Sequence, residues 1–230
     1  MISSRAIVDR RRFRRFVAYV RPGSEDVVLD LTVGHDLLAR SFARRAGRVY
    51  HLQPHGETGR RSQLIESVQG NSHDIPFPDE SFDLVVCGPT FHHLKPTRSA
   101  LTEAFRVCRD GGRIAIEDVV ASEQDMRARY QNRLERLRDR SHLDYLRLSE
   151  LIAQLGEAGF NICEARTFAL QREFNEWLAG ARPSVQRVEL IRRLMSGGQE
   201  ADISGLAIRP LDDAMEFTQR LAWVIAQRQL

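Results

Sequence analysis

One stretch of the chain constrains the fold more than any other. A continuous apolar run, Val27–Leu31, leads into a turn at Gly34 and then into a helical segment, Leu37–Arg45. A nearly continuous apolar run is typical of a strand buried on both faces, as in a parallel sheet covered by helices. In open sheets of this kind, ligands bind outside the carboxyl ends of the strands, where this turn lies. The segment therefore predicts an α/β fold with a binding site near Gly34.

The alternation of strands and helices continues along the chain, which implies a parallel, doubly wound sheet with right-handed crossovers. The further strands expected are Arg48–Leu52, Ser67–Gly70, Phe82–Cys87, Arg113–Asp118, Ile162–Leu170 and Met215–Ala226. The further helices expected are Leu64–Ser67, Arg98–Cys108, Glu123–Arg138, Ser149–Ala158, Glu173–Leu178 and Val185–Met195, and a turn is expected at 210–213.

Length and composition limit the class of protein. The 230 residues, 42% of them hydrophobic, fit one domain, with a nucleotide-binding half at 1–120 and a half of lid helices and C-terminal strands at 121–230. There is no run of 18 apolar residues and no signal-peptide pattern at the N-terminus, so we expect a cytoplasmic protein that does not bind membranes. The three cysteines have no metal-type spacing, and no metal site is expected.

The positive charge of the chain is not arranged as a nucleic-acid patch. The net charge is +3, and Lys95 is the only lysine among 34 basic residues. The densest basic run, 10–15, belongs to a segment in which Phe13, Phe16, Val17 and Val20 follow the i, i+3, i+4, i+7 spacing of an amphipathic helix. We therefore expect a covering helix with a solvated basic face, and no nucleic-acid partner.

Three motifs in the middle of the chain carry a family resemblance. The segment 71–86, Asn-Ser-His-Asp-Ile-Pro-Phe-Pro-Asp-Glu-Ser-Phe-Asp-Leu-Val-Val, closely resembles the link between strands three and four of class I S-adenosylmethionine (SAM) methyltransferases of the ubiquinone/menaquinone-biosynthesis type. Phe-His-His-Leu at 91–94 and Arg-Val-Cys-Arg-Asp-Gly-Gly-Arg at 106–113 are similar to two later motifs of that family. The resemblance implies a Rossmann-like, seven-stranded, doubly wound sheet with an antiparallel last strand and helical lid insertions. It also implies methyl transfer from SAM to a small organic molecule.

The first cofactor contact that the resemblance implies is the glycine-rich turn after strand one. Asp30 matches the acid that precedes this turn, and Gly34 matches its middle glycine. Thr32 and Asp36 replace the first and third glycines. A threonine held at positive φ would be strained by about 1–3 kcal/mol. Asp36 would either place a carboxylate near that of SAM or cap the following helix.

The remaining cofactor positions follow strands two, three and four. Gln53 stands where the family has the acid that binds the ribose hydroxyls, and Asn71 where it has the aspartate that accepts from the adenine amino group. Ser72 and Gly88 complete the implied set. Each change from a charged to a neutral acceptor costs about 1 kcal/mol or more. With a strained turn the loss reaches about 3–5 kcal/mol, on the order of 10²–10³-fold in affinity. The sequence leaves open whether SAM still binds.

Histidines gather at one edge of the predicted sheet. Six of the seven lie at or just past the carboxyl ends of predicted strands, namely His35, His51, His55, His73, His92 and His93. Histidine serves as a base near neutral pH or as a metal ligand, but no pair here has the i, i+4 spacing of a zinc site. We predict that His93 or His92 is the base that takes the acceptor proton, and that the other member of the pair is structural.

The second half of the chain supplies candidate substrate contacts. His142, Tyr145 and Tyr130 are predicted to belong to a lid that covers the substrate. The alternative is that Tyr130 and its neighbours form the core-facing stripe of a helix.

Three functions remain open at this point. The first is a SAM-dependent methyltransferase acting on a small organic molecule. The second is an enzyme on the same fold that no longer uses SAM and performs histidine-assisted cyclisation, elimination or hydrolysis in a biosynthetic pathway. The third is a non-catalytic partner subunit. A homodimer or a complex with a partner enzyme is compatible with each.

Overall fold

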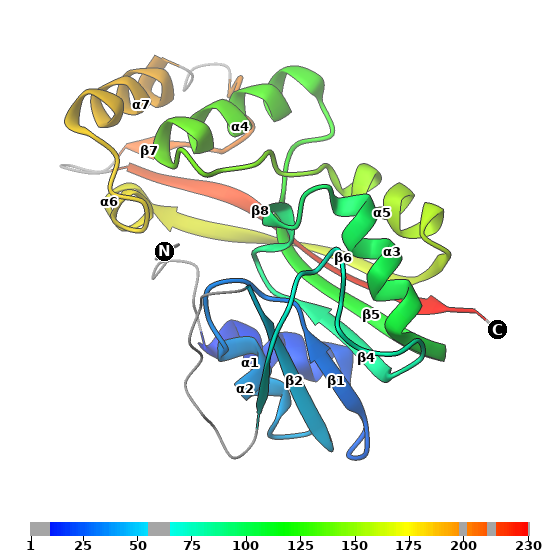
Figure 1. Cartoon of the computed structure of the whole chain (residues 1–230). Coiled ribbons are helices and arrows are strands. Elements are labelled where there is room, and N and C mark those ends of the chain that lie inside the picture. The colour runs from blue at the N-terminus through cyan, green and yellow to red at the C-terminus, as the bar shows by residue number, and fades with distance from the viewer. Residues whose placement is uncertain (1–9, 55–64, 198–201, 211–214, 230) are drawn as a thin grey trace. The chain divides into compact units, whose positions relative to one another are not determined.

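The computed structural model describes residues 10–54, 65–197, 202–210 and 215–229 (Figure 1). Its centre is one sheet in the order β3-β2-β1-β4-β5-β8-β6, and the short strand β7 pairs with β8. The strands are β1 (Val27–Asp30), β2 (Arg48–Gln53), β3 (Glu66–Gln69), β4 (Phe82–Cys87), β5 (Cys108–Val120), β6 (Phe160–Glu173), β7 (Arg209–Pro210) and β8 (Met215–Arg228).

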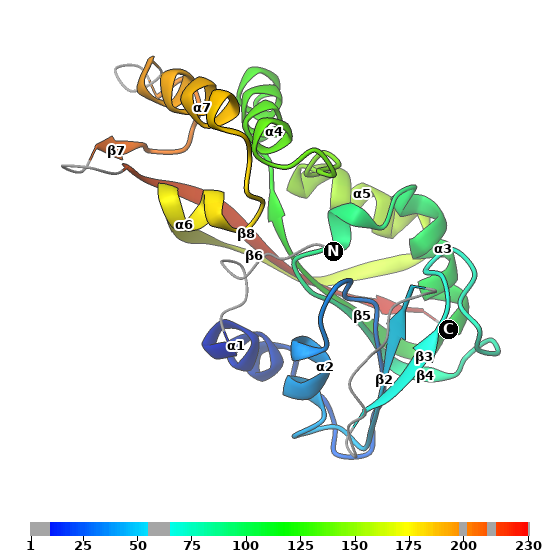
Figure 2. The ribbon, with the colours of Figure 1, turned by 60° about the vertical axis from the view of Figure 1, so that its left-hand side comes forward.

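Helices lie on both faces of this sheet. They are α1 (Arg10–Val20), α2 (Leu37–Phe42), α3 (Thr97–Val107), α4 (Asp125–Arg138), α5 (Leu148–Glu157), α6 (Phe174–Ala179) and α7 (Val185–Gly197), with a single 3-10 turn, η1, at Phe91–His93. Figure 2 shows α1 and α2 on one face of the strands and α3 and α5 on the other. None of the helices in the described part of the chain is both long enough and apolar enough to cross a membrane.

The sheet confirms the predicted fold class. Strand β1 pairs in parallel with both β2 and β4, and β4 pairs in parallel with β5. The last long strand, β8, runs opposite to its neighbour β6, as their arrowheads in Figure 1 show. Val28 and Leu29 of β1 are completely buried, as expected of a strand covered on both faces.

Helix α1 is amphipathic as predicted, with one exception on its basic face. Phe13 and Phe16 are fully buried, and most of the arginines are exposed. Arg12, however, is 9% exposed, and its Nε atom lies 2.9 Å from Glu117 Oε1 on β5. Trp223 of β8 donates to the other oxygen of Glu117 at 2.6 Å. Burial raises the pKa of Glu117, although Arg12 and Trp223 act in the opposite direction.

Two details of the predicted secondary structure are wrong. The helix expected over Leu64–Ser67 is instead strand β3 from Glu66 onward, because this segment pairs in parallel with β2. Leu64 lies outside the described residues, as do 211–213 of the expected turn. Strand β5 begins at Cys108, not at Arg113, and so includes two glycines that were expected only to end a helix. Gly111, at φ +72°, lies where the register between β4 and β5 shifts.

The described residues divide into two compact units. The larger unit comprises 10–118, 151–166 and 223–229, and the smaller unit comprises 119–150, 167–197, 202–210 and 215–222. Strands β5, β6 and β8 contribute residues to both. The smaller unit has its own hydrophobic core, which consists of Leu134, Phe174, Trp177, Leu178, Ile191, Met195, Leu206, Met215 and Phe217.

Candidate functional site

Asp30, at the carboxyl end of β1, is completely buried and organises the turn that follows. Its Oδ1 atom accepts from the Thr32 N–H at 2.9 Å and from the Thr32 hydroxyl at 2.5 Å. Its Oδ2 atom accepts from Ala39 N–H at 2.8 Å, in the first turn of α2, where backbone N–H groups have no partner within the helix. Burial raises the pKa of Asp30, while His51 and the Thr32 hydrogen bonds act to lower it.

Thr32 joins this turn to the strand beside it. Its hydroxyl oxygen accepts from the backbone N–H of Gly88 at 2.8 Å, just beyond β4. A Cβ atom on Gly88 would lie only 3.1 Å from that oxygen, so the Thr32 side chain can approach the backbone of residue 88 closely because that residue is glycine. The predicted strain at Thr32 is wrong, since its φ is not positive, and Gly34 at +87° is the one residue of the turn in the left-handed region.

Asp36 neither caps α2 nor leaves its charge unpaired. It occupies the N-cap position, but its side chain makes no hydrogen bond to the helix backbone, so capping by this side chain is wrong. Its Oδ2 atom instead lies 2.6 Å from Nη2 of Arg40. Burial acts to raise the pKa of Asp36, but the contact with Arg40 outweighs it, and the pKa is lowered.

The carboxyl end of β2 contributes a second pair of buried polar side chains. His51 Nε2 donates to the carbonyl oxygen of Thr32 at 2.9 Å, because that oxygen can only accept. The other ring nitrogen of His51 therefore accepts from the Gln53 amide, at 3.4 Å. This bond orients the Gln53 side chain, and its amide oxygen has no hydrogen bond to any described residue. The position that the family fills with an acid thus retains one acceptor.

Asn71 and Ser72 follow β3 at the same edge of the sheet. The N–H of Gly70 donates to the carbonyl oxygen of Gln53 at 2.9 Å, which places the start of this loop beside the end of β2. Asn71 Oδ1 accepts from the backbone N–H of His73 at 3.0 Å and still has a second lone pair. Ser72 is half-buried within the turn. His55, another histidine predicted for this edge, lies outside the described residues.

The segment after β4 carries the paired histidines. His92 is 5% exposed; its backbone N–H donates to Oδ2 of Asp118 at 2.8 Å, and its ring Nδ1 lies 2.9 Å from the same oxygen. Because a carboxylate can only accept, Nδ1 of His92 carries the proton. The ring of His93, which is half-buried, lies 4.1 Å from that of His92. Asp118 was missed from the sequence, although it ends a predicted strand at this same edge.

Three further side chains, those of Thr90, Cys87 and His35, lie near the carboxyl ends of β1 and β4. Thr90 accepts from the backbone N–H of Val33 at 3.0 Å and so ties the segment after β4 to the turn after β1. Burial raises the pKa of the Cys87 thiol well above its usual value, which argues against a thiolate nucleophile there. Both ring nitrogens of His35 are buried without a hydrogen-bond partner among the described residues, and burial lowers the pKa of its imidazole.

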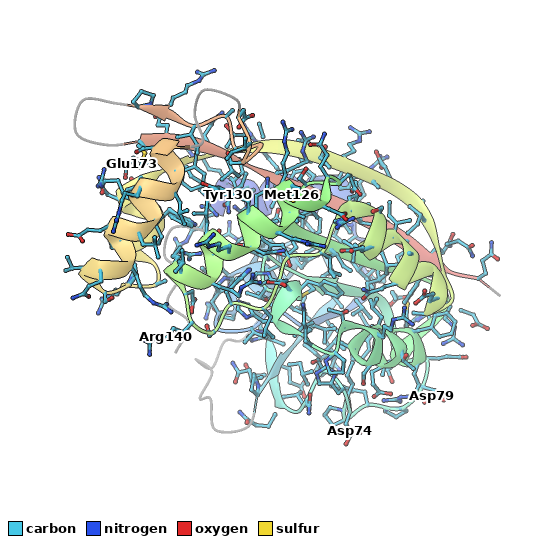
Figure 3. The ribbon with its side chains drawn as sticks, turned by 90° about the horizontal axis from the view of Figure 1, so that it is seen from above. Asp74, Asp79, Met126, Tyr130, Arg140 and Glu173 are labelled. Carbon is cyan, nitrogen blue, oxygen red and sulfur yellow. The ribbon has the colours of Figure 1, made fainter. Side chains whose placement is uncertain are left out.

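The three predicted substrate contacts lie in the smaller unit. His142 is buried, with Nε2 at 3.3 Å from Asn132 Oδ1 and its ring 4.6 Å from that of Tyr145. Tyr130 instead donates its hydroxyl to the carbonyl oxygen of Leu194 on α7, at 2.5 Å. Met126, labelled beside Tyr130 in Figure 3, is 77% exposed and is not part of a core-facing stripe. Leu134 lies in the core of the smaller unit, and Tyr130 and Leu137 pack against it, so the core-facing stripe is confirmed for these three residues.

Comparison with known proteins identifies a family that is similar to this chain. Residues 29–116, which contain the turn, β2, β3 and the paired histidines, match the family model of a methyltransferase domain. This confirms the family that was inferred from the motifs at 71–86, 91–94 and 106–113.

Curated relatives extend the similarity along the chain. Over 141 residues the chain is 31% identical to an uncharacterized methyltransferase of Bacillus subtilis, YcgJ, and the match covers 60% of this chain and 56% of that protein. Over 110 residues it is 33% identical to the ubiquinone/menaquinone biosynthesis C-methyltransferase of Burkholderia mallei, with 43% of this chain and 44% of that protein covered. The chain thus spans roughly half of the length of these relatives.

Solved structures share the whole fold. A putative methyltransferase from Bacillus halodurans matches with a TM-score of 0.85 at 23% identity, over 95% of this chain and 99% of that chain. The structure of YcgJ from Bacillus subtilis matches with a TM-score of 0.84 at 20% identity, over 96% and 100%. At these identities the likeness establishes the fold, which is that of a class I methyltransferase.

Proposed function

We propose that the chain is a SAM-dependent methyltransferase that acts on a small organic molecule. The observation that carries this proposal is the hydrogen-bonded connection from Asp30 through Thr32 to Gly88, with Gly34 at φ +87°. This connection supports the turn after β1 without strain, although two of its three expected glycines are replaced. The methyltransferase domain at 29–116 supports the same proposal.

The described residues fit the polar groups of the cofactor. The backbone at Gly34 would approach the methionine end, Gln53 would accept from a ribose hydroxyl, and Asn71 would accept from the adenine amino group. Ser72 and Gly88 would line the same surface. Because Thr32 is not strained, only the two neutral acceptors weaken the binding of SAM. The expected loss of binding free energy is then about 2 kcal/mol, or roughly 30-fold in affinity. Such a loss weakens the binding of SAM without abolishing it.

The paired histidines would provide the acid–base chemistry. When bound, SAM supplies a methyl group on a positively charged sulfur, so the chain must align the acceptor and remove its proton. We assign the base to His93, because it is half-buried whereas the ring of His92 is held against Asp118. Asp118 is then a positioning residue that fixes His92 and, through ring packing, the orientation of His93.

Substitution at the end of β2 tests the cofactor assignment. Gln53→Asp restores the charged acceptor and should tighten SAM binding roughly ten-fold in calorimetry, since hydrogen bonds to charged groups exceed neutral ones by about 1 kcal/mol or more. Gln186→Asp adds the same charge at an exposed position of α7 and should leave the affinity unchanged. Equal affinities of Gln53→Asp and the wild type would contradict the assignment.

A second function is favoured by the loss of charged acceptors at Gln53 and Asn71. The chain could use the same edge of the sheet for histidine-assisted chemistry without SAM. One solved structure of the same fold, with a TM-score of 0.65 at 16% identity, is the [4+2]-cyclase SpnF. The first function requires that the wild-type chain binds SAM, whereas this one does not.

A further inference from the structure

Two side chains of helix α3 hold the loop between β3 and β4. Loop 71–79 begins with Asn71, the residue that the proposed function assigns to adenine. The two side chains are those of Glu103 and Arg106, which lie three positions apart and therefore on the same side of the helix. Arg106 is also the first residue of the motif at 106–113. This motif and the loop are thus joined in space although they are separate in the sequence.

Both backbone groups of Ile75, in the middle of this loop, are bonded to the pair. Glu103 Oε2 accepts from the Ile75 N–H at 2.8 Å, and Nη2 of Arg106 donates to the Ile75 carbonyl oxygen at 2.9 Å. Nη1 of Arg106 donates to the carbonyl oxygen of Phe77 and to Oδ1 of Asp79, both at 2.8 Å. The pair therefore holds the loop at three of its residues.

The pair is itself held by a bidentate contact. Nε and Nη2 of Arg106 donate to the two carboxylate oxygens of Glu103 at 2.8 and 2.7 Å. These hydrogen bonds from Arg106 outweigh burial and lower the pKa of Glu103. A guanidinium spreads five donors over a plane, so it can bind a carboxylate and two carbonyl oxygens at once, whereas an ammonium has its donors on one atom. The contact with the loop thus depends on the shape of the guanidinium as well as on its charge.

Packing acts on the same part of the loop. Ile75 is 2% exposed, and the ring of Pro76 lies so close to Gly70 that a Cβ atom there would be 2.7 Å from Pro76 Cδ. The ring of Phe77 lies 5.1 Å from that of Tyr50 on β2. Hydrogen bonds from α3 and packing therefore fix the same backbone at 75–77.

The acceptor of Asn71 is oriented by the residues that precede Ile75. Its Oδ1 atom accepts from the backbone N–H of His73, and its carbonyl oxygen accepts from the N–H of Asp74, both at 3.0 Å. Because a backbone N–H can only donate, the side-chain atom that faces His73 is the amide oxygen. Its remaining lone pair can accept from a purine 6-amino group but not from a 6-oxo group.

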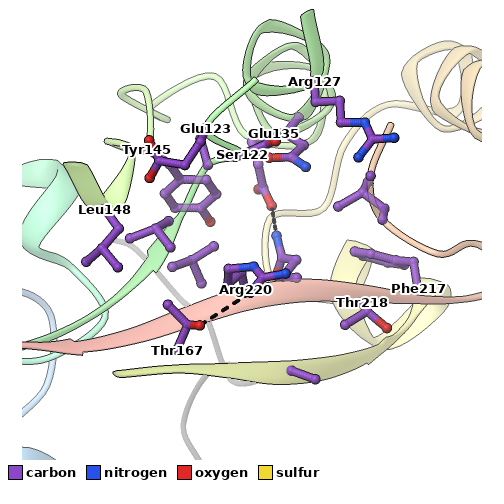
Figure 4. A pocket seen from close by; sticks show the side chains of 18 of the residues that line it. Ser122, Glu123, Arg127, Glu135, Tyr145, Leu148, Thr167, Phe217, Thr218 and Arg220 are labelled. Atoms are coloured by element: carbon purple, nitrogen blue, oxygen red, sulfur yellow. Dashed lines mark hydrogen bonds between the residues drawn. The ribbon is translucent and has the colours of Figure 1, made fainter. Parts of the chain in front are cut away.

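A cavity of about 500 Å³ in the smaller unit has a different set of polar groups (Figure 4). None of the described residues that line it is an assigned cofactor position. Its buried acid, Glu135, already accepts from Trp177 at 3.1 Å and from Gln219 at 2.6 Å, and it pairs with Arg138. The groups assigned to the purine are therefore those of loop 71–79.

We propose that Glu103 and Arg106 form a clamp that positions Asn71 for selective recognition of the adenine 6-amino group. Both are positioning residues, since they touch the loop and not the nucleotide. The proposal rests on the proposed function, because it requires that the adenine of the cofactor lies at Asn71.

Calorimetry with two matched ligands tests the selectivity on the full chain. S-adenosylhomocysteine carries the 6-amino group, and S-inosylhomocysteine has a 6-oxo group and a protonated N1 instead. The wild type should bind the adenosyl compound roughly ten-fold more tightly. In Arg106→Met this preference should fall to about two-fold or less, because the acceptor of Asn71 is no longer held in place. An unchanged preference in Arg106→Met would overturn the proposal.

Two more variants separate the clamp from charge and from general effects on α3. Arg106→Lys keeps the positive charge but not the planar donors, so it should lose most of the preference for the adenosyl compound. Full retention of the preference in Arg106→Lys would overturn the proposal. Arg98→Met removes an exposed ion pair with Glu157 from the same helix and should keep the wild-type preference. Thermal unfolding of each variant establishes that it is folded.

Hydrogen exchange of the ligand-free chain measures the clamp without any nucleotide. Exchange at Ile75 should be roughly ten-fold faster or more in Arg106→Met, while the amides of β1 keep their wild-type rates. Unchanged exchange at Ile75 would overturn the clamp. If the wild type binds neither ligand, the proposed function and the adenine role are both refuted. If the wild type binds both and Arg106→Met keeps the preference, the role of the clamp alone is refuted.

Discussion

Removal of the Thr32 hydroxyl should cost more stability than any surface change. Thr32→Val keeps the shape of the side chain but loses the hydrogen bond that the hydroxyl donates to Asp30 at 2.5 Å. It also removes the acceptor of Gly88 N–H, which is buried. A hydrogen bond to a charged group contributes about 1.5–3 kcal/mol, and a buried donor without a partner costs about 1–3 kcal/mol. The variant should lose about 3–5 kcal/mol of unfolding free energy.

Urea unfolding followed by circular dichroism measures this loss. With a dependence on urea of about 3 kcal/mol per molar, the transition should shift down by at least about 1 M. Thr32→Ser keeps the hydroxyl and should lose far less. Thr102→Val, on the exposed face of α3, should stay within about 0.5 kcal/mol of the wild type. The reasoning fails if Thr32→Val lies within about 1 kcal/mol of the wild type.

Three further predictions follow from other buried groups. Glu135→Gln should destabilise the chain by about 3–5 kcal/mol near pH 7, because it leaves Arg138 buried without its partner. The pKa of Glu135 is lower in the folded than in the unfolded state. The stability that Glu135 contributes is therefore fully present above its unfolded pKa of roughly 4.3, and it is lost as the pH falls through the folded pKa. The difference in unfolding free energy between Glu135→Gln and the wild type should accordingly become smaller in acid. His35→Phe should raise the thermal midpoint, with a gain of about 1 kcal/mol, because the imidazole nitrogens have no partner among the described residues; a lower midpoint would contradict this. His93→Gln should lower kcat for methyl transfer by about 10²-fold or more with little change in SAM affinity, and unchanged turnover would remove His93 from its role.

The strands nearest the site could be predicted because their sequence pattern is local. The mainly apolar runs at Val27–Leu31 and Phe82–Cys87 indicated strands, and the structure has β1 and β4 there. The motif at 71–86 similarly indicated the loop between β3 and β4. Each of these patterns lies within a short segment of the chain. The pairing of the strands in the sheet agrees with the secondary structure that each pattern predicts.

The polar contacts of the site could not be predicted in the same way. From the sequence alone, Thr32 is only a substitution for an expected glycine. Its role follows from its hydrogen bond to Gly88, which lies 56 positions later in the chain. Asp118 has the same character, because its partner His92 is 26 positions away and on a different element. Residue spacing within a segment carries no information on such pairs. The sequence therefore indicated which positions would line the edge of the sheet, but not how Thr32 replaces a glycine without strain.

The most direct test of the account is a calorimetric titration of the wild-type chain with SAM. The turn after β1 is unstrained, and Gln53 retains an acceptor, so we predict saturable binding in the micromolar range. Absence of binding at millimolar SAM would contradict the central claim and would favour chemistry without the cofactor.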